Sequence, residues 1–430
     1  MARLLIQGGR PLSGVITPSG NKNAALPLLA ACLLTDERMV LHNLPNIRDV
    51  RSMLAIMRRL GVRVQKLGPN SLAIQAKTLK NTALDPDLCR QIRASILFAG
   101  PLLARSGHVR LPPPGGDVIG RRRIDTHLEA LMALGADSKR NGGYELQARR
   151  LEGTTIFLDE ASVTGTENVL MAASLSKGKT TILNAACEPH VQELALCLNR
   201  MGAQIEGIGS NQLFVHGTEK LHGTEWTVGP DHIEVGSMIG LAATTGGELT
   251  IKDAGIPHLH MSRVMFERLG VEIDYRGNDV FVPGGQDLHI RSDIDGAIPK
   301  IDDGPWPHFP TDLMSIAVVI ATQSRGTVLI WEKMFDGRLF FVDRLIAMGA
   351  RIVLCDPQRA VIAGASRLHG GPLSSPDIRA GMALLIAALC AEGNSEIRNI
   401  EQIDRGYENI EVKLQSLGAQ VERIEDSIVG

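Results

Sequence analysis

A lysine ahead of a helical segment is the first candidate for chemistry in this chain. Lys22 and Asn23 follow Ser19-Gly20-Asn21 and precede the helical pattern of residues 24–34. Free backbone N–H groups at a helix start attract anions, so a lysine at this place suits phosphate. The alternative is an ordinary solvated lysine in a first helical turn, and the sequence leaves it open.

A loop rich in proline, glycine and arginine is the second candidate. Residues 112–123 read PPPGGDVIGRRR, with a stiff stem, a permissive tip, one carboxylate at Asp117 and an arginine triplet that ends at Arg123. This make-up is typical of a lid, and the planar guanidinium group pairs bidentately with phosphate or carboxylate. A solvated basic face is the alternative for the triplet.

Asp312 is the third candidate. It ends the motif His308-Phe309-Pro310-Thr311-Asp312 and precedes the apolar run 313–321, where a carboxylate can also simply cap a helix. More charged residues occur at or near expected helix starts: Arg93, Arg338, Asp377, Arg379, Asp404 and Arg405. Surface ion pairs are the alternative for each of these alone, but their equivalent places in a repeat favour a shared role.

Signatures of several other chemistries are missing from the sequence. It contains no Walker A motif, no G-x-G-x-x-G after a strand, no G-x-S-x-G and no HExxH. The six cysteines show no metal-ligand spacing. What remains is a closing cleft lined by lysine, arginine and two aspartates, which suits polyanionic small substrates and acid–base chemistry without a metal or cofactor.

The elements that position these residues form a six-fold repeat. An apolar-Gly-small pattern followed by an alternating segment recurs every 67 to 79 residues, at Gly61, Gly135, Gly202, Gly270, Gly349 and Gly418. Such self-similarity indicates stacked supersecondary units. In the third copy, the helical pattern 166–175, the β-branched run 179–184, a second helix from Pro189 and a hairpin over 204–215 predict a unit of helix, strand, helix and hairpin.

Six such units favour two domains of three units each. We expect a boundary near Pro230, with residues 22–229 in one domain and residues 1–21 and 230–430 in the other. The segment Leu4–Ile6 is expected to pair with the last unit, which lacks room for its own final strand after Val421. Two domains joined by two chain segments are typical of proteins in which a ligand binds in a cleft that the domains close. A non-enzymatic solenoid is the alternative, but it does not explain the motifs.

Composition narrows the class of protein further. Aromatic residues make up only 3% of the chain, too few for stacking on single-stranded nucleic acid, and a net charge of -2 draws it neither to nucleic acid nor to anionic lipid. No signal peptide or membrane span is visible, and the scattered cysteines suit a reducing compartment. We therefore expect a cytoplasmic protein that is a monomer or a weak oligomer.

Seven motifs give the chain a specific resemblance. They are GNKNAALP, IRASILFAGPLLAR, GGDVIGRR, ASVTGTEN, FPTD, DIRAG and IDRGYE, in this order along essentially the whole sequence. In them the chain resembles the enolpyruvyl transferases, and among these the UDP-N-acetylglucosamine 1-carboxyvinyltransferases. The resemblance implies an α/β fold of two inside-out α/β barrels, each built from three units.

The resemblance also implies a reaction and roles for individual residues. The enolpyruvyl group of phosphoenolpyruvate would pass to the 3′-hydroxyl of UDP-N-acetylglucosamine through a tetrahedral ketal, with release of phosphate, as the first committed step of peptidoglycan synthesis. Asp312 would accept the hydroxyl proton, and Asn23 would bind the sugar or the forming phosphate. The phosphoenolpyruvate anions would be held by Lys22, Arg93, Arg122, Arg379 and Arg405. The nucleotide and the rest of the substrate would contact Arg122, Arg123, Ile124, Asp125, Thr126, Ser162, Val163, Thr164, Met334, Arg338 and Asp377.

The chain departs from the family pattern in the expected lid. Asp117 stands where the family usually has a cysteine, although some members carry aspartate. We expect Asp117 to be the general acid, protonated by burial and the substrate phosphate in the closed complex, although a role at phosphate release is equally open. The antibiotic fosfomycin alkylates the family's lid thiol, so a carboxylate predicts intrinsic resistance.

Two smaller departures concern the nucleotide. Arg123 replaces a usual proline, and Glu160 lies where lysine or proline is common. They leave open the same reaction on another nucleotide, such as uridine monophosphate. A shikimate-pathway synthase would leave the uridine-binding stretch unexplained. The rival from a different class is an inactive relative that binds nucleotide without turnover.

Overall fold

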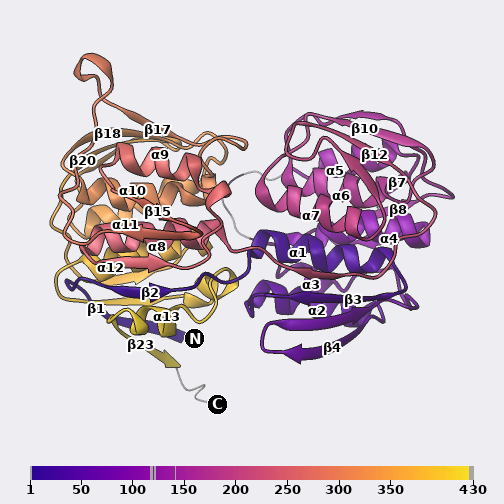
Figure 1. Cartoon of the computed structure of the whole chain (residues 1–430), viewed down its shortest axis with the longest axis horizontal. Helices are drawn as coiled ribbons and strands as arrows, with labels where there is room; N and C mark the ends of the chain where they lie inside the picture. Colours follow the sequence, from indigo (N-terminus) through magenta and orange to yellow (C-terminus); the bar gives the residue numbers. More distant parts are fainter. Residues whose placement is uncertain (1, 117–119, 121–122, 141, 426–430) are drawn as a thin grey trace. The chain divides into compact units, whose positions relative to one another are not determined.

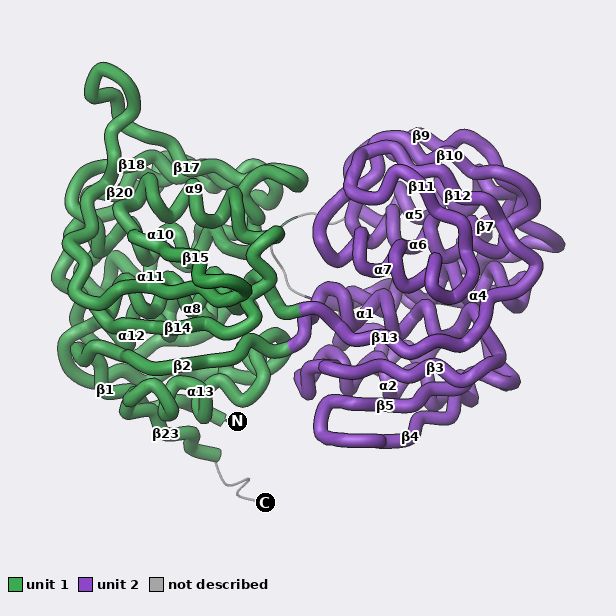
Figure 2. The backbone as a smooth tube through the Cα atoms, in the orientation of Figure 1, with its two compact units in different colours: residues 1–19, 118–121, 230–430 green, residues 20–117, 122–229 purple. Residues whose placement is uncertain are grey.

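The computed structural model describes residues 2–116, 120, 123–140 and 142–425. The chain forms two compact units (Figure 2): unit 1 comprises residues 1–19, 118–121 and 230–430, and unit 2 comprises residues 20–117 and 122–229. Residues 20 and 21, which we expected with the second half, group with unit 2, where Asn21 caps the first helix.

Each unit is built around three inner helices (Figure 1). They are α1 (Lys22–Ala31), α4 (Ala99–Ser106) and α6 (Val163–Ala173) in unit 2, and α8 (His232–Thr245), α10 (Met314–Gln323) and α12 (Ile378–Cys390) in unit 1. Their residues are mostly buried on all sides: in α12, only the last residue is not buried. A helix that is apolar all round belongs inside a core, so the helices lie inside and the sheets outside. The predicted inside-out α/β fold is confirmed.

Three sheets and three further helices complete unit 2. Its strands are β3 (Arg38–His42), β4 (Arg63–Gly68), β5 (Ser71–Gln75), β6 (His108–Leu111), β7 (Asp137–Arg140), β8 (Tyr144–Gln147), β9 (Thr155–Phe157), β10 (Lys179–Leu183), β11 (Gln204–Glu206), β12 (Gln212–His216) and β13 (Glu225–Thr227). They pair in the orders β13-β3-β5-β4, β6-β8-β7 and β11-β12-β10-β9. The outer helices are α2 (Arg48–Arg59), α5 (Asp125–Ala133) and α7 (Pro189–Arg200), and shorter helices are η1 (Cys32–Leu34), α3 (Pro86–Cys89) and η2 (Arg93–Phe98).

Unit 1 repeats this plan. Its strands are β1 (Ala2–Gln7), β2 (Gly14–Ile16), β14 (Leu249–Ile251), β15 (Asp274–Arg276), β16 (Asp279–Val282), β17 (Lys300–Asp302), β18 (Gly326–Trp331), β19 (Ile352–Asp356), β20 (Arg359–Gly364), β21 (Pro372–Ser374), β22 (Asn394–Arg398) and β23 (Gln420–Glu425). They pair in the orders β21-β22-β1-β23, β15-β16-β14-β2 and β17-β18-β20-β19. The helices outside the core are α9 (His260–Arg268), α11 (Val342–Ala347) and α13 (Ile410–Ser416), with η3 (Ile256–His258), η4 (Ile294–Gly296), η5 (Thr311–Leu313), η6 (Arg338–Phe341) and η7 (Ile400–Arg405).

The third copy has the predicted anatomy of α6, β10, α7 and the β11–β12 hairpin, preceded by β9, which pairs parallel with β10. The six repeat glycines all have φ between 89° and 107°. Only glycine adopts this conformation without strain, which explains why the residue recurs at the end of each second helix.

The N-terminal strand closes the last copy. β1 pairs antiparallel with both β22 and β23, and places Leu4 opposite Ile397 and Arg423. The predicted pairing is therefore confirmed: β1 takes the place that β12 has in the third copy, between the first strand and the other hairpin strand. Among the helices that the structure describes, none has both the length and the apolar character needed to cross a bilayer.

Candidate active site

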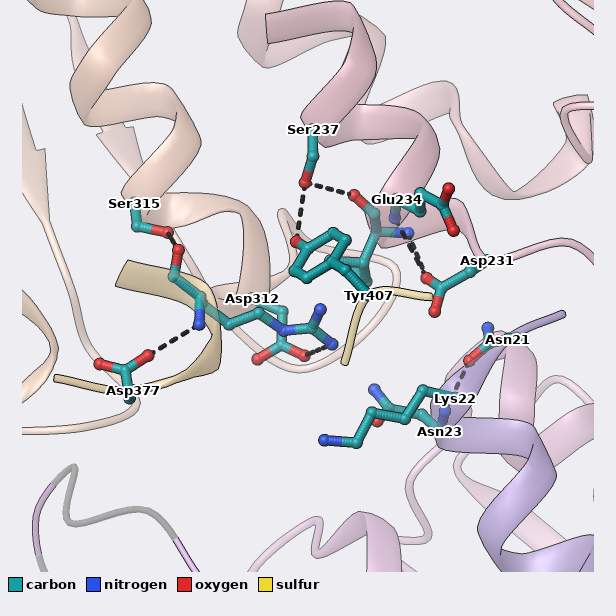
Figure 3. Close-up of polar contacts among 12 residues, drawn as sticks. Asn21, Lys22, Asn23, Asp231, Glu234, Ser237, Asp312, Ser315, Asp377 and Tyr407 are labelled. Atoms are coloured by element: carbon teal, nitrogen blue, oxygen red, sulfur yellow. Dashed lines mark hydrogen bonds and ion pairs between the residues drawn. The ribbon is translucent and has the colours of Figure 1, made fainter. Parts of the chain in front are cut away.

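Two of the inner helices of unit 1, α8 and α12, begin with aspartates that bind backbone N–H groups. The Asp231 carboxylate accepts hydrogen bonds from the backbone of Ile233 and Glu234 at 2.9 and 3.2 Å, at the start of α8 (Figure 3). The Asp377 carboxylate accepts from Arg379 and Ala380 at 2.8 and 3.0 Å, at the start of α12. Asp377, an expected substrate contact, is thus a helix cap in this structure.

Asp312, by contrast, binds side chains. Its Oδ1 accepts a hydrogen bond from Nη2 of Arg338 at 2.6 Å, and its Oδ2 lies 2.8 Å from Nη2 of Arg379. The N-cap residues are Pro310 for η5 and Leu313 for α10, so Asp312 does not occupy the helix N-cap position that the alternative gave it. An ionised carboxylate is an acceptor only, so Asp312 has the chemistry of a proton acceptor.

Arg379 is a buried, fixed cation. Burial alone would lower its pKa, but Asp312, Tyr407 and Asp231 together raise the pKa above the usual value for arginine. The guanidinium carbon lies 5.6 Å from the centre of the Tyr407 ring, whose hydroxyl is 2.9 Å from Oγ of Ser237. Oγ of Ser315 in α10 donates to the backbone oxygen of Arg379 at 3.1 Å and ties α10 to α12.

The remaining expected residues of unit 1 lie in short helices and turns. Arg405 ends η7, is buried, and donates from Nη1 to Oε1 of Gln402 at 2.9 Å. The neighbouring Asp404 accepts hydrogen bonds from Arg423 at 2.7 and 3.0 Å. This part-buried ion pair agrees with the ion-pair alternative that we gave for Asp404. Met334 is exposed in the turn after β18.

A histidine that the sequence motifs missed lies beside this cluster. His232 is the first residue of α8, and its ring centre is 6.2 Å from Trp306 and 6.3 Å from His258. Burial, against the opposing charge of Asp231, lowers the pKa of His232 to about 4, so the ring is neutral near pH 7. The charges of Asp312 and Arg379 also affect the pKa of His232, so this neutral polar ring lies near both groups.

In unit 2, Lys22 is not a solvated lysine. Its Nζ lies 2.9 Å from Oδ2 of Asp49, and both side chains are buried. Lys22 is the first residue of α1, which Asn21 caps by accepting from the backbone N–H groups of Asn23 and Ala24 at 2.8 and 3.3 Å. The solvated alternative is therefore wrong. Asp49, in the first turn of α2, was missed because nothing in the sequence links it to Lys22.

This buried pair leads to a first prediction. Asp49→Asn leaves the buried Lys22 ammonium without this carboxylate, which should destabilise the fold by about 3–5 kcal/mol. Phosphoenolpyruvate should raise the melting temperature more in the variant than in the wild type, because its anions replace the missing charge. Asp36→Asn, at an exposed carboxylate of unit 2, is the control. An equal ligand-induced shift in both proteins would contradict a role of Lys22 in anion binding.

The expected uridine-binding stretch forms a network at the start of α5. Arg93, the first residue of η2, donates from Nη2 to the backbone oxygen of Arg123 at 2.9 Å. Arg123 in turn binds Asp125 at 2.9 Å and Asp159 at 3.0 Å. Thr126 donates to Asp159 at 2.7 Å, and this bond, more than the charge of Arg123, lowers the pKa of Asp159. Next in sequence to Arg123, Ile124 is buried and precedes the first turn of α5.

The expected diphosphate-binding loop, Ser162 to Thr164, opens α6. Oγ of Ser162 accepts from the backbone N–H of Gly165 at 3.2 Å, and Val163 is the first helical residue. Oγ1 of Thr164 lies 3.1 Å from Nε2 of His127 in α5. The loop is thereby fixed to the helix that carries Asp125 and Thr126.

His127, which the sequence analysis did not identify, fixes the Thr164 hydroxyl. Burial, and to a lesser extent Arg93, lowers the pKa of His127 to about 3, so the ring is neutral. Nδ2 of Asn168 donates to Nδ1 of His127 at 2.9 Å, which assigns the ring proton to Nε2. Nε2 then donates to Thr164, and the hydroxyl keeps its own proton for an outside acceptor, such as a phosphate oxygen.

Two of the expected site residues, Asp117 and Arg122, lie outside the described residues. Within the part of the chain that the structure describes, no group of three or more His, Cys, Asp or Glu residues could hold a metal ion. The described set thus includes the part-buried carboxylate of Asp312 and the buried cations Lys22, Arg338 and Arg379 at or next to helix starts. Such a set can bind anions and accept a proton.

Comparison with known proteins identifies the family. The sequence model of EPSP synthase (3-phosphoshikimate 1-carboxyvinyltransferase) matches residues 6–414. The chain therefore belongs to this family of enolpyruvyl transferases, and the resemblance seen in its motifs is confirmed.

Close relatives narrow the comparison. A protein from Bradyrhizobium diazoefficiens described as UDP-N-acetylglucosamine 1-carboxyvinyltransferase is 56% identical over 420 residues, which cover 98% of this chain and 97% of that protein. A protein of the same description from Treponema denticola is 55% identical over 422 residues, covering 98% and 99%.

Solved structures support the fold. The enolpyruvyl transferase NikO from Streptomyces tendae superposes with a TM-score of 0.88 at 25% identity, over 98% of each chain. An EPSP synthase from Acinetobacter baumannii gives a TM-score of 0.76 at 18% identity, over 99% of this chain and 100% of that one.

Proposed function

We infer that this chain is an enzyme that transfers the enolpyruvyl group of phosphoenolpyruvate to the 3′-hydroxyl of UDP-N-acetylglucosamine and releases phosphate. This is the first committed step of peptidoglycan synthesis. The full-length relatives at more than half identity carry that description. The observation that supports it most in the structure is the Asp312 carboxylate, held by two buried guanidiniums.

The proposed chemistry is addition followed by elimination. Asp312 accepts the proton of the attacking hydroxyl, and a general acid protonates the methylene carbon so that the vinyl carbon becomes electrophilic. Asp117 is the proposed acid, acting at addition or at phosphate release. The ketal then loses a methyl proton and phosphate.

The proposed binding residues form two groups, one for the anions of phosphoenolpyruvate and one for the nucleotide. Lys22, Arg93, Arg122, Arg379 and Arg405 would neutralise phosphoenolpyruvate, with Asn23 at the sugar or forming phosphate. The uridine diphosphate would contact residues 122–126 and 162–164, where Thr164 has a hydroxyl proton available. Met334, Arg338 and Asp377 complete the proposed set. Both groups of residues must reach the same substrates for turnover.

Phosphate release from phosphoenolpyruvate tests this function. The wild-type protein should release phosphate with UDP-N-acetylglucosamine, and at least a hundredfold more slowly with uridine monophosphate or shikimate 3-phosphate. Faster release with either rival acceptor would reassign the substrate, and no release with any would indicate a binding protein. We further propose a cytoplasmic monomer or weak oligomer that needs no metal, nucleic acid or membrane.

A further inference from the structure

Two buried carboxyl groups lie next to each other behind Asp312 in unit 1. β17 and β18 are parallel neighbours whose last residues, Asp302 and Trp331, lie opposite each other. Asp303 and Glu332 directly follow these strands and therefore lie alongside each other. Both residues are completely buried, at 0% exposure. Neither belongs to a motif identified from the sequence.

Glu332 fastens the two segments that supply Asp312 and Arg338. Oγ1 of Thr311 donates to the Glu332 carboxyl group at 3.0 and 3.1 Å, and Thr311 directly precedes Asp312. Oε1 of Glu332 also accepts from the backbone N–H groups of Met334 and Phe335 at 3.1 and 3.0 Å. That turn leads into η6, whose first residue, Arg338, donates to Asp312.

The two carboxyl groups require a proton between them. Oδ1 of Asp303 accepts from the backbone N–H of Lys333 at 2.6 Å, whereas Oδ2 is buried and finds no ordinary donor among the described residues. Two ionised carboxylates only accept hydrogen bonds and repel each other, but one proton converts the contact into an O–H···O bond. Glu332 lies within hydrogen-bonding reach of Asp303.

The surrounding charges leave this proton in place. Burial, then the hydrogen bond and charge of Asp303, raise the pKa of Glu332 to about 9, against the opposing effects of Arg338 and Thr311. The nearby lysines are engaged elsewhere: Nζ of Lys333 and of Lys300 lie 2.5 and 3.1 Å from Oδ2 of Asp302. Asp312, which follows Thr311 in sequence, is bound by Arg338 and Arg379.

We propose that Asp303 and Glu332 share one proton, and that this pair is a positioning device for the Asp312–Arg338 ion pair. While the proton is present, Glu332 holds Thr311 and the 334–338 turn in place. Loss of the proton puts two negative charges side by side in the core, and their separation displaces both segments. Glu332 is therefore a positioning residue. Only the kinetic part of the test rests on the proposed function.

Thermal unfolding tests the shared proton without any assay of activity. Folded Glu332 keeps a proton that the unfolded chain gives up above its ordinary pKa of 4.5, so its contribution to stability is full below that pH and is lost as the pH rises to about 9. The Glu332→Gln side chain has no proton that titrates in this pH range. The melting temperature of the variant minus that of the wild type should therefore rise from about pH 5 to pH 9 and then level off.

Two further variants make the result specific. Asp303→Asn supplies an N–H donor to Glu332 and should show the same rise. Asp302→Asn is the matched control: although burial opposes them, Lys333 and Lys300 lower the pKa of Asp302, so the stability lost on its removal should vary with pH only at the acid end and stay constant between pH 5 and pH 9. A flat difference for Glu332→Gln, or the same rise in Asp302→Asn, would overturn the shared proton.

Turnover tests the positioning role. We expect Glu332→Ala to lose at least tenfold in kcat at pH 7 with little change in KM, and Glu332→Gln to recover most of that loss. The ratio of kcat for Glu332→Gln to that of the wild type should rise at least threefold between pH 7 and pH 9.5. Equal kcat losses for both variants, or a constant ratio, would overturn the role. If the wild type has no turnover, the proposed function fails, while the melting temperatures still decide the shared proton.

Discussion

Asp312→Asn is expected to lower kcat by roughly 100- to 10,000-fold, the range for loss of a general base. The carboxamide has nearly the same shape but cannot take the proton of the attacking hydroxyl. Since Arg338 and Arg379 lose their counter-ion, the variant should also melt at a lower temperature. Turnover measured well below that temperature, with saturating substrates, separates the two effects.

Substrate binding provides the control for this variant. UDP-N-acetylglucosamine should bind to Asp312→Asn within tenfold of its wild-type affinity, measured by calorimetry. Asp343→Asn removes an exposed carboxylate of the same unit and should leave kcat near the wild-type value. A kcat for Asp312→Asn within tenfold of the wild type would exclude Asp312 as the base.

Asp117→Cys is expected to convert a fosfomycin-resistant protein into one that the epoxide inactivates with time. A thiol has an ordinary pKa of about 8.5 and its thiolate is a strong nucleophile, whereas a carboxylate with a pKa of about 3.9 is a far weaker one. Because the motif GGDVIGRR aligns Asp117 with the position at which the family usually has a cysteine, we expect the wild type to keep its activity after long exposure.

Mass spectrometry of the treated proteins is the sharpest readout for this variant. The Asp117→Cys protein should gain one covalent adduct on the peptide that contains residue 117. Asp117→Ser, which has no thiol, is the matched control and should remain unmodified. An unmodified Asp117→Cys protein that still turns over would contradict the alignment of this loop with the family's lid.

The sequence predicts the architecture well because each copy of the repeat is marked by residues that are close together in sequence. A glycine with positive φ at the end of each second helix repeats six times, and the predicted pairing of strand β1 with the last unit is observed. These features depend on chain length and on neighbours in sequence, which a single sequence displays.

The partners of the site residues were harder to predict. Lys22 was left open as a solvated side chain, because its partner Asp49 lies on another helix. Asp312 was left open as a helix cap, because its partners are distant in sequence: Arg338 begins η6 and Arg379 lies in α12. The sequence locates charged residues at helix starts, but only the packing of the inner helices determines which charges meet.

Several buried polar groups were given no role from the sequence, although one of them, Asn168, ends the motif ASVTGTEN. His127 and Asn168 lie in regular helices, and Asp303 and Glu332 directly follow strands β17 and β18. Their roles follow from burial and from hydrogen bonds between distant segments. Such groups leave no short pattern in a sequence, because each is defined by a partner far along the chain.

Turnover in deuterium oxide tests the proposed addition–elimination most directly. If the methylene carbon of phosphoenolpyruvate is protonated to a methyl group in the ketal and then loses a proton, the vinyl methylene of the product must contain solvent deuterium. Proton NMR of the purified product of phosphoenolpyruvate and UDP-N-acetylglucosamine reports this. The account predicts deuterium at that carbon; an enolpyruvyl product with only protium there, or no product at all, would contradict it.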